Sequence, residues 1–210
     1  MTNSSSLIDS LEVYVLNNPE EVTPHWVSHF IVPTANELLI KIKNKDGNSG
    51  FGLATSYTDI SPLVKPFSNG IADLIIGEDP FSPEKLYEKI FKLTDTRISS
   101  EKGWSREALI RISAALDIAC WDLMGKASNV PLYKLFGGYR NKVPVYVTCA
   151  YYREGKDEKE LRDELKKLIQ LGHQSFKVKV GGLTIKEDYK RLEIIREEIG
   201  SEKSLMIDVN

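Results

Sequence analysis

The segment Ser175-Phe176-Lys177-Val178-Lys179-Val180 is a short β-prone run in which two lysines alternate with apolar residues. On either side of it, residues 158–171 and 184–199 have the apolar spacing of amphipathic helices. Two further β-prone runs lie at 143–150 and 204–209, so strands and helices alternate with a repeat of about thirty residues. This alternation predicts a parallel sheet whose strands are joined by helical crossovers.

The residues before this alternation follow a different pattern. Residues 11–16 and 37–43 favour strands, and Asn44–Gly50 is rich in residues that tolerate the turn of a hairpin. The returning strand is expected at 51–57. An antiparallel meander of this kind, followed by helices, predicts an α+β arrangement.

Three helix starts follow the meander. Ser61-Pro62 opens the first helix and Ser82-Pro83 opens the second, because proline is favoured in the first turn. The strongest helix is expected over 106–126, with Ser105 as its N-cap and Gly125 at its end. A broad apolar stripe along this helix indicates that it lies deep in a core.

The composition excludes several classes of protein. Apolar residues make up 41% and charged residues 28% of the chain, which permits a sizeable core and rules out a disordered chain. The 28 basic and 30 acidic residues give a net charge of −2 without blocks of like charge, so we expect no nucleic-acid partner.

No apolar run approaches the roughly 20 residues that span a bilayer, so we expect no membrane partner. The first ten residues lack the features of a secretory signal. Cys120 and Cys149 fit neither a disulfide framework nor a zinc site, which favours a cytoplasmic location.

The two lysines of the 175–180 strand form the first candidate site. Because side chains alternate across a strand, Lys177 and Lys179 are expected on the same face. Burial and the neighbouring like charge both favour the neutral amine, so we expect the pKa of at least one lysine to fall. Such a lysine can serve as a proton-abstracting base or as a Schiff-base nucleophile. The structural alternative is an edge strand with both lysines in water.

A second pair of polar residues ends the next strand. Asp208 and Asn210 share a face at the carboxyl end of this strand, which is where β/α sheets and barrels place their active sites. A carboxylate at this position is a natural ligand for Mg²⁺, a hard cation that prefers oxygen. The structural alternative is an aspartate that caps the following helix. Beside the lysine pair, Asp208 predicts a base that faces a metal.

Two other groups are assigned structural roles. His25 and His29 have the spacing of metal ligands on a helix, but the flanking prolines favour a surface or loop role over zinc binding. Gly181-Gly182 follows a strand, and it is expected to form a tight turn or to leave room for a ligand.

Two stretches of the chain resemble a known family. Residues 112–127 (ISAALDIACWDLMGKA), followed by 130–138 (VPLYKLFGG), closely resemble the signature helix of the mandelate racemase/muconate lactonizing enzyme group of the enolase superfamily. The strand with Lys177 and Lys179 and the strand with Asp208 follow in the order that this family shows.

The resemblance implies a fold of two domains. Residues 1–140 would form an N-terminal α+β capping domain, and residues 141–210 would form the beginning of a C-terminal (β/α)₈ barrel of the TIM type. Because a barrel of this type typically needs about 250 residues, we expect the barrel to be incomplete after its third strand and the chain to be a fragment.

The resemblance also implies a Mg²⁺ ion that stabilises the enolate formed when the proton α to a carboxylate is removed. By position, Lys179 matches the family's catalytic base and Lys177 matches the companion that lowers the pKa of that base. Asp208 matches the first of three metal ligands. Asn210 matches a polar neighbour at the same strand end, which makes it a candidate for substrate binding.

In this family two loops of the capping domain choose the substrate. The corresponding regions here are 22–32 and 51–59, which makes Trp26 and Tyr57 candidates for substrate binding. Many relatives carry an acidic residue after a Gly-x-Gly sequence, whereas this chain has Leu53, so its closing loop is expected to address a different substrate group.

The expected function is Mg²⁺-dependent proton abstraction from a small-molecule carboxylate, with sugar-acid dehydration first because polar loops suit polyols. A racemase or epimerase and a lactonizing cycloisomerase are the alternatives within the superfamily. Alternatives of other classes are a metal-independent Schiff-base aldolase that uses Lys179 and a non-catalytic oligomerisation fragment. By resemblance to the family, we also expect a homo-oligomer.

Overall fold

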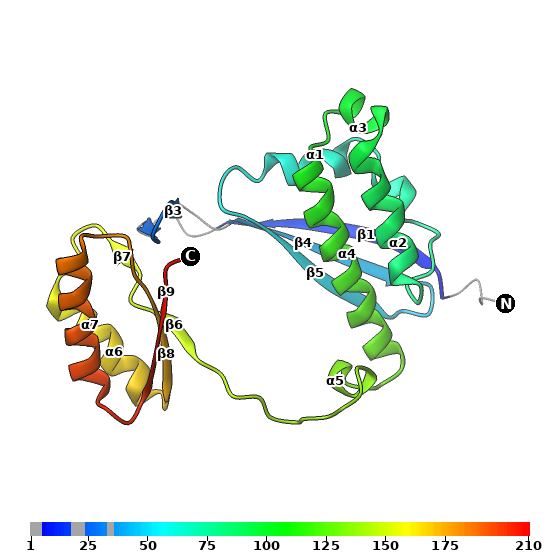
Figure 1. Ribbon diagram of the computed structural model, residues 1–210. Helices are drawn as coiled ribbons and strands as arrows, with labels where there is room; N and C mark the ends of the chain where they lie inside the picture. Colours follow the sequence, from blue (N-terminus) through cyan, green and yellow to red (C-terminus); the bar gives the residue numbers. More distant parts are fainter. Residues whose placement is uncertain (1–5, 18–23, 33–35) are drawn as a thin grey trace. The chain divides into compact units, whose positions relative to one another are not determined.

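The computed structural model describes residues 6–17, 24–32 and 36–210 (Figure 1). Within these ranges the chain divides into two compact units. The first unit comprises residues 6–17 and 36–141, and the second comprises residues 24–32 and 142–210. We expected all residues up to 140 in one domain. Residues 24–32 differ from this expectation, because they pair with a strand of the second unit.

An antiparallel sheet forms one layer of the first unit. Its strands are β1 (Ile8–Leu16), β4 (Asn36–Asn44) and β5 (Ser49–Ser56), in the order β1-β4-β5. Alternate side chains of β4, namely Leu38, Ile40 and Ile42, are fully buried, which is the pattern of a sheet with one face against a core. The predicted hairpin between β4 and β5 is confirmed, with the two strands antiparallel.

Helix α4 (Arg106–Ala127) packs against this sheet (Figure 1). Ser105 caps the helix as predicted, and its hydroxyl accepts a hydrogen bond of 3.1 Å from the backbone N of Ala108. The helix lies so close to β5 that a Cβ atom added at Gly52 would overlap the carbonyl oxygen of Ala115. Glycine at this position of β5 is therefore required by packing against the helix.

The helix predicted over 106–126 is confirmed to within one residue, but Gly125 does not stop it, because the helix continues to Ala127. Gly125 is buried, and a Cβ added there would lie 3.1 Å from the side chain of Leu132. The chain folds back directly after the helix, where the backbone N of Val130 donates to the carbonyl of Gly125 at 3.0 Å. Close approach, and not helix termination, explains this glycine.

Shorter helices complete the first unit. They are α1 (Ser61–Ser68), α2 (Pro83–Phe91), α3 (Arg97–Lys102), α5 (Leu132–Leu135) and the 3₁₀ turns Ala72–Leu74 and Lys92–Asp95. The helix starts predicted at Ser61-Pro62 and Ser82-Pro83 are confirmed, because both prolines lie in the first turn. Apolar residues of α1, α2 and α4 share one core with the sheet.

The second unit alternates strands and helices as predicted. Its elements are β6 (Val147–Cys149), α6 (Glu158–Gln170), β8 (Ser175–Lys179), α7 (Ile185–Ile199) and β9 (Ser204–Asp208). The strands form a parallel sheet in the order β6-β8-β9, and α6 and α7 cover one face of it (Figure 1). Asp157 caps α6, and Thr184 forms a capping box with Glu187 at the start of α7.

Strand β6 is shorter than the predicted run 143–150. Its register pairs Val147 with Phe176, close to the start of β8 at Ser175. Residues before Tyr146 therefore have no strand residue opposite them, and residues 141–146 are exposed. Their β propensity is not enough to form a strand without a partner.

Residues 24–32 contribute two short strands to a second sheet of this unit. The strands β2 (His25–Trp26), β3 (Ile31–Val32) and β7 (Tyr152–Arg153) stand in the order β3-β2-β7. Because His25 lies in a strand, it does not share a helical face with His29. The ring of His25 contacts Tyr151 edge-on, with 4.8 Å between the centroids.

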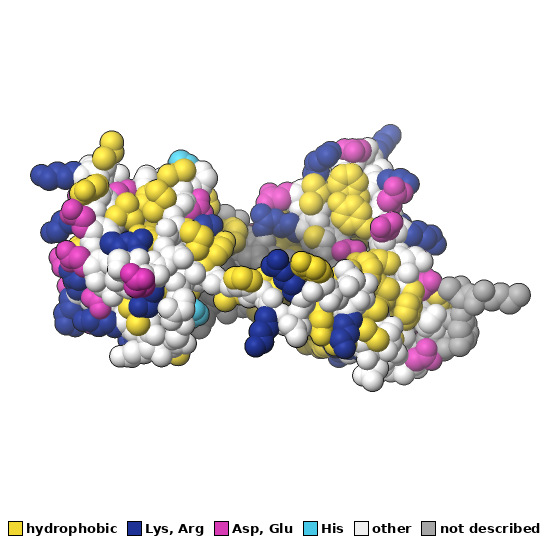
Figure 2. All heavy atoms as spheres, turned by 60° about the horizontal axis from the view of Figure 1, so that its bottom comes forward, with side chains coloured by type: hydrophobic (Ala, Val, Ile, Leu, Met, Phe, Trp, Pro, Cys, Tyr) yellow, Lys and Arg dark blue, Asp and Glu magenta, His cyan; other side chains and the backbone are white. Residues whose placement is uncertain are grey.

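Three observations bear on the exclusions drawn from composition. Across the described ranges, no helix combines the length and apolarity that crossing a membrane demands. Cys120 and Cys149 are buried and free, and burial raises the pKa of each thiol to about 12. Basic and acidic side chains are interleaved over the face of each unit seen in Figure 2.

Candidate functional site

Strand β8 separates an apolar face from a charged one. Phe176 and Val178 are fully buried in the core under α6 and α7. Lys177 and Lys179 alternate with them, so both lysines lie on the face of the sheet away from these helices. Their side chains are 27% and 13% exposed, respectively. The expectation that the two lysines share a face is confirmed.

Asp208 on β9 joins the two lysines. It is the direct partner of Lys179 in the parallel register of β8 and β9. The Nζ atoms of Lys177 and Lys179 lie 2.9 Å and 2.7 Å from the same carboxylate oxygen, Asp208 Oδ2. The carboxyl ends of two neighbouring strands thus bring a carboxylate and two ammonium groups into contact.

Asn210, two residues after Asp208, completes this cluster. Its amide oxygen accepts a hydrogen bond from Lys179 Nζ, and its backbone N donates to Asp208 Oδ1 at 2.8 Å. The backbone of Asn210 has φ +67°, in the left-handed region that asparagine tolerates. We call Lys177, Lys179, Asp208 and Asn210 the strand-end cluster.

The charges of the strand-end cluster stabilise one another. Hydrogen bonds from Lys177, from Lys179 and from the backbone of Asn210 hold the pKa of Asp208 far below its usual value. The hydrogen bond to Asp208 raises the pKa of Lys177, against the opposing effect of burial. For Lys177 this corrects the expected fall: the nearby carboxylate outweighs burial and the like charge of Lys179.

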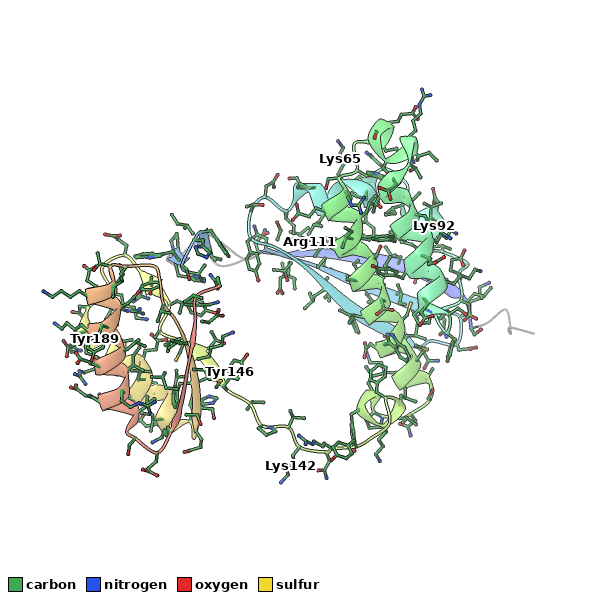
Figure 3. The ribbon with its side chains drawn as sticks, viewed as in Figure 1. Lys65, Lys92, Arg111, Lys142, Tyr146 and Tyr189 are labelled. Carbon is green, nitrogen blue, oxygen red and sulfur yellow. The ribbon has the colours of Figure 1, made fainter. Side chains whose placement is uncertain are left out.

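Tyr146 is a neighbour of the cluster that the sequence pattern did not reveal. Lys177 Nζ lies over its ring, 5.6 Å from the centroid, so the pair forms a cation–π contact. In Figure 3, Tyr146 lies beside the sheet and away from the helices, whereas Tyr189 projects from the outer side of α7. The signal was available: Thr148 pairs with Lys177, and alternation then places Tyr146 on the same face.

The cluster offers oxygen donors suited to a hard cation. Mg²⁺ is commonly held by one or two carboxylates and several waters, and Asp208, whose pKa is low, supplies one ionised carboxylate. The amide oxygen of Asn210 is a second oxygen donor beside it. In the part of the chain that the structure describes, no three His, Cys, Asp or Glu side chains gather as a metal site, either in the cluster or outside it. Asp208 therefore fits one position in the shell of a Mg²⁺ ion.

Two of the candidates for substrate binding, Trp26 and Tyr57, lie in different units. Trp26 lies on β2 of the second unit, with its ring stacked on Tyr152 at 5.8 Å between centroids. It lines a cavity of about 500 Å³ that none of the strand-end residues lines. Tyr57 follows β5 in the first unit and is 49% exposed.

Comparison with known families matches both halves of the chain. Residues 10–137 match the family described as "Mandelate racemase / muconate lactonizing enzyme, N-terminal domain". Residues 160–210 match the family described as "Enolase C-terminal domain-like". The second match contains the whole strand-end cluster.

Individual relatives agree with these matches. The chain is 35% identical to an arabinonate dehydratase from Saccharolobus solfataricus over 81% of its own length and 44% of that protein. It is 28% identical to an N-succinyl-L-Arg/Lys racemase from Bacillus cereus over 97% of its length and 52% of that protein. The chain thus spans about half the length of these curated relatives.

A solved structure extends the comparison to the fold. The L-talarate/galactarate dehydratase from Salmonella typhimurium LT2, liganded with Mg and L-lyxarohydroxamate, matches with a TM-score of 0.81 and 26% identity. The match covers 97% of this chain and 52% of the dehydratase. The arrangement of the described elements is therefore that of roughly half of such an enzyme.

Proposed function

Because this chain belongs to the mandelate racemase/muconate lactonizing enzyme family of the enolase superfamily, we propose that the intact protein dehydrates a sugar acid. The reaction would begin with removal of the proton α to the carboxylate. The observation that carries this proposal is the contact of Lys177 and Lys179 with one oxygen of Asp208 at the carboxyl ends of two parallel strands.

The proposed fold of the intact protein follows the family. Residues 1–140, apart from the segment that pairs with β7, form the capping domain, and residues 141–210 begin the barrel. The face of β8 and β9 that carries the lysines is then the inner face of the barrel. This supports a reaction at the carboxyl ends of the strands, where barrel enzymes place their catalytic groups.

Lys179 is the proposed base. An ammonium group has three N–H donors, and Lys179 Nζ directs two of them to Asp208 and Asn210. Loss of the remaining proton leaves a lone pair on a nitrogen whose orientation is already set. That lone pair can accept the proton from the α-carbon of the substrate.

Lys177 and Asp208 supply charges that the proposed reaction needs. Lys177 keeps a second positive charge beside the substrate carboxylate, because its contact with Asp208 raises its pKa. Asp208 is the residue of this chain that would hold Mg²⁺, and Asn210 is a proposed substrate contact. When bound, the ion supplies positive charge that stabilises the substrate carboxylate as its α-proton is lost.

Dehydration is preferred to racemisation because two of the reported relatives are sugar-acid dehydratases. Racemisation is the second candidate, since the racemase from Bacillus cereus matches 97% of the chain. Both reactions need the same first step, the transfer of an α-proton to a base. Trp26 and Tyr57 are proposed as substrate contacts of the loops.

Proton exchange in D₂O tests the proposal. The intact gene product is incubated with Mg²⁺ and arabinonate, galactarate or N-succinyl-L-lysine, and NMR follows loss of the α-proton signal. Dehydration predicts a 2-keto acid product, whereas racemisation predicts deuterium incorporation without elimination. EDTA should stop both reactions.

Other outcomes would favour the alternatives of other classes. Activity that survives EDTA, with covalent trapping of substrate by borohydride, would favour a Schiff-base aldolase. No exchange with any of the three acids and no response to Mg²⁺ would contradict the proposal.

A further inference from the structure

A buried carboxylate lies directly behind the lysine strand. Asp188 is in the first turn of α7 and is only 7% exposed. Its carboxylate accepts hydrogen bonds from the hydroxyl of Tyr152 at 2.5 Å, from the backbone N of Gly181 at 2.7 Å and from Arg191 Nη1 at 3.0 Å. Burial of a carboxylate is costly unless it is paired and hydrogen-bonded, and here three different elements supply the donors.

Arg191 carries the connection to the strand ends. Its Nη2 donates to the carbonyl of Ala150 at 2.6 Å, directly after β6. Its Nη1 also reaches the carbonyl of Lys179 at 3.4 Å. One guanidinium group thus joins the carboxyl ends of β6 and β8, and the second of these carbonyls belongs to the proposed base itself.

The turn after Lys179 is fixed by the same group of residues. Gly181, whose backbone N binds Asp188, has φ +89°, which glycine adopts without strain. The backbone N of Gly182 donates to the hydroxyl of Tyr152 at 3.2 Å, and a Cβ added at Gly182 would lie 2.5 Å from the Tyr152 ring. Gly181-Gly182 therefore forms the tight turn that was one of the two predicted roles.

Tyr152 also connects this network to residues 24–32. Its ring stacks on Trp26 and lies 4.0 Å beneath the guanidinium of Arg191. Ser28 adds a second link, because its hydroxyl donates to the carbonyl of Val180 at 2.8 Å. The proposed substrate-binding segment and the proposed base are thus joined through a continuous set of contacts.

We infer that Asp188 and Arg191 are positioning residues that set the orientation of Lys179, and that Tyr152 joins them to the substrate-binding segment at Trp26. The inference rests on the proposed function, because it assigns Lys179 as the base. It also explains why the ion pair of Asp188 and Arg191 is buried beside the turn at Gly181-Gly182. Backbone hydrogen bonds alone would be enough to form that turn.

The chain contains a matched ion-pair site for comparison. Arg162 joins α6 to α7, with Nη2 2.9 Å from both Glu158 and Glu197. Among the described residues, its ion pairs are with Glu158, Glu197 and Glu198, and none is with β8 or the strand-end cluster. A change at Arg162 therefore disturbs the packing of the same two helices without touching the strand that carries Lys179.

The test compares Arg191→Lys with Arg162→Lys in the intact gene product with Mg²⁺. Lysine keeps the charge but cannot bridge two carbonyls and a carboxylate as the guanidinium fork does. For loss of the α-proton of arabinonate in D₂O, we expect Arg191→Lys to lower kcat about 100-fold with little change in KM, since a small displacement of a catalytic group has this effect. Arg162→Lys should retain the kcat of the unmodified protein.

A second readout does not require turnover. Trace acetylation with acetic anhydride, followed by mass spectrometry, reports the reactivity of Lys179 relative to Lys177. An amine held as a donor by Asp208 and Asn210 reacts slowly, so the ratio should rise in Arg191→Lys and not in Arg162→Lys. If Arg191→Lys fails to fold, Tyr152→Phe takes its place in the test. This variant removes only the hydroxyl that binds Asp188, and it should also raise the ratio.

The outcomes separate the inference from the proposed function. If the unmodified protein exchanges no proton, the proposed function fails, and the acetylation ratio alone decides whether Lys179 is held by this network. If exchange occurs but Arg191→Lys keeps its kcat and its acetylation ratio, the inference is overturned while the proposed function stands. Equal losses in Arg191→Lys and Arg162→Lys would indicate a structural role only.

Discussion

Lys179 Nζ lies 2.7 Å from Asp208 Oδ2, and the two residues are direct partners in the parallel register of β8 and β9. Side chains alternate across a strand, so a shift of one residue would turn Asp208 toward the helices. The register of two strands therefore determines whether a carboxylate meets the lysine pair. It is fixed from the core side, where Phe176 is fully buried and pairs with Leu205, which packs against the same core.

Removal of the proposed base should abolish proton exchange. For Lys179→Ala in the intact gene product, we expect the rate at which arabinonate loses its α-proton in D₂O to fall about 1,000-fold, because general base catalysis contributes on this order. Lys186→Ala is the matched control, since Lys186 is an exposed lysine of α7. NMR measures exchange, and circular dichroism checks that the fold is kept. Exchange that persists in Lys179→Ala would reassign the base.

Loss of the carboxylate should weaken binding of Mg²⁺. For Asp208→Asn we expect the Kd for Mg²⁺, measured by isothermal titration calorimetry, to rise by at least about tenfold. The reason is that the loss of a residue that supports a metal site typically lowers metal affinity by this factor or more. Asp163→Asn is the control, since Asp163 forms an exposed pair with Lys159. The pKa of Lys177 should also fall in Asp208→Asn, because the bond to Asp208 raises it. An unchanged Kd would remove Asp208 from the metal site.

Local patterns in the sequence predict the charged face of the second unit. Alternation within 175–180 places Lys177 and Lys179 together, and the strand–helix repeat brings Asp208 to the same end of the sheet. These conclusions need only the period of a strand and the direction of a parallel sheet. Both are properties of short segments, so a single sequence contains them.

The contacts that the sequence did not predict depend on residues far apart in the chain. The pKa of Lys177 rises because its ammonium group forms a hydrogen bond with Asp208, which lies on a different strand. Residues 24–32 join the second unit because β2 pairs with β7, more than a hundred residues later. The pairing of β2 with β7 leaves no periodic signal, since two-residue strands are too short to show alternation.

Glycine at position 52 should be essential for packing of the first unit. A Cβ atom in Gly52→Ala would overlap the carbonyl of Ala115, and backbone cannot move aside as a flexible side chain can. We expect the free energy of unfolding to fall by about 3 kcal/mol, at the upper end of overpacking effects. Urea denaturation followed by circular dichroism measures it. Leu53→Ala, on the exposed side of β5, is the control, and equal stabilities of the two variants would contradict the close approach of α4.

Acid should erase the contribution of Asp188 to stability. Burial alone would raise the pKa of Asp188, but hydrogen bonds from Tyr152, Gly181 and Arg191 together lower it below its usual value. A group whose pKa is lower in the folded protein stabilises the fold above its unfolded pKa, about 3.9 for aspartate, and loses this effect as the pH falls through the folded value.

Unfolding in urea at several pH values tests this difference. At about pH 7, Asp188→Asn should be less stable than the unmodified protein by about 3 kcal/mol, since it breaks a buried charge pair. The gap between the two proteins should stay constant down to about pH 5 and shrink below about pH 4. Asp163→Asn should show a small gap at every pH, because its pair with Lys159 is exposed. A gap for Asp188→Asn that persists unchanged into acid would mean that its carboxylate charge does not stabilise the fold.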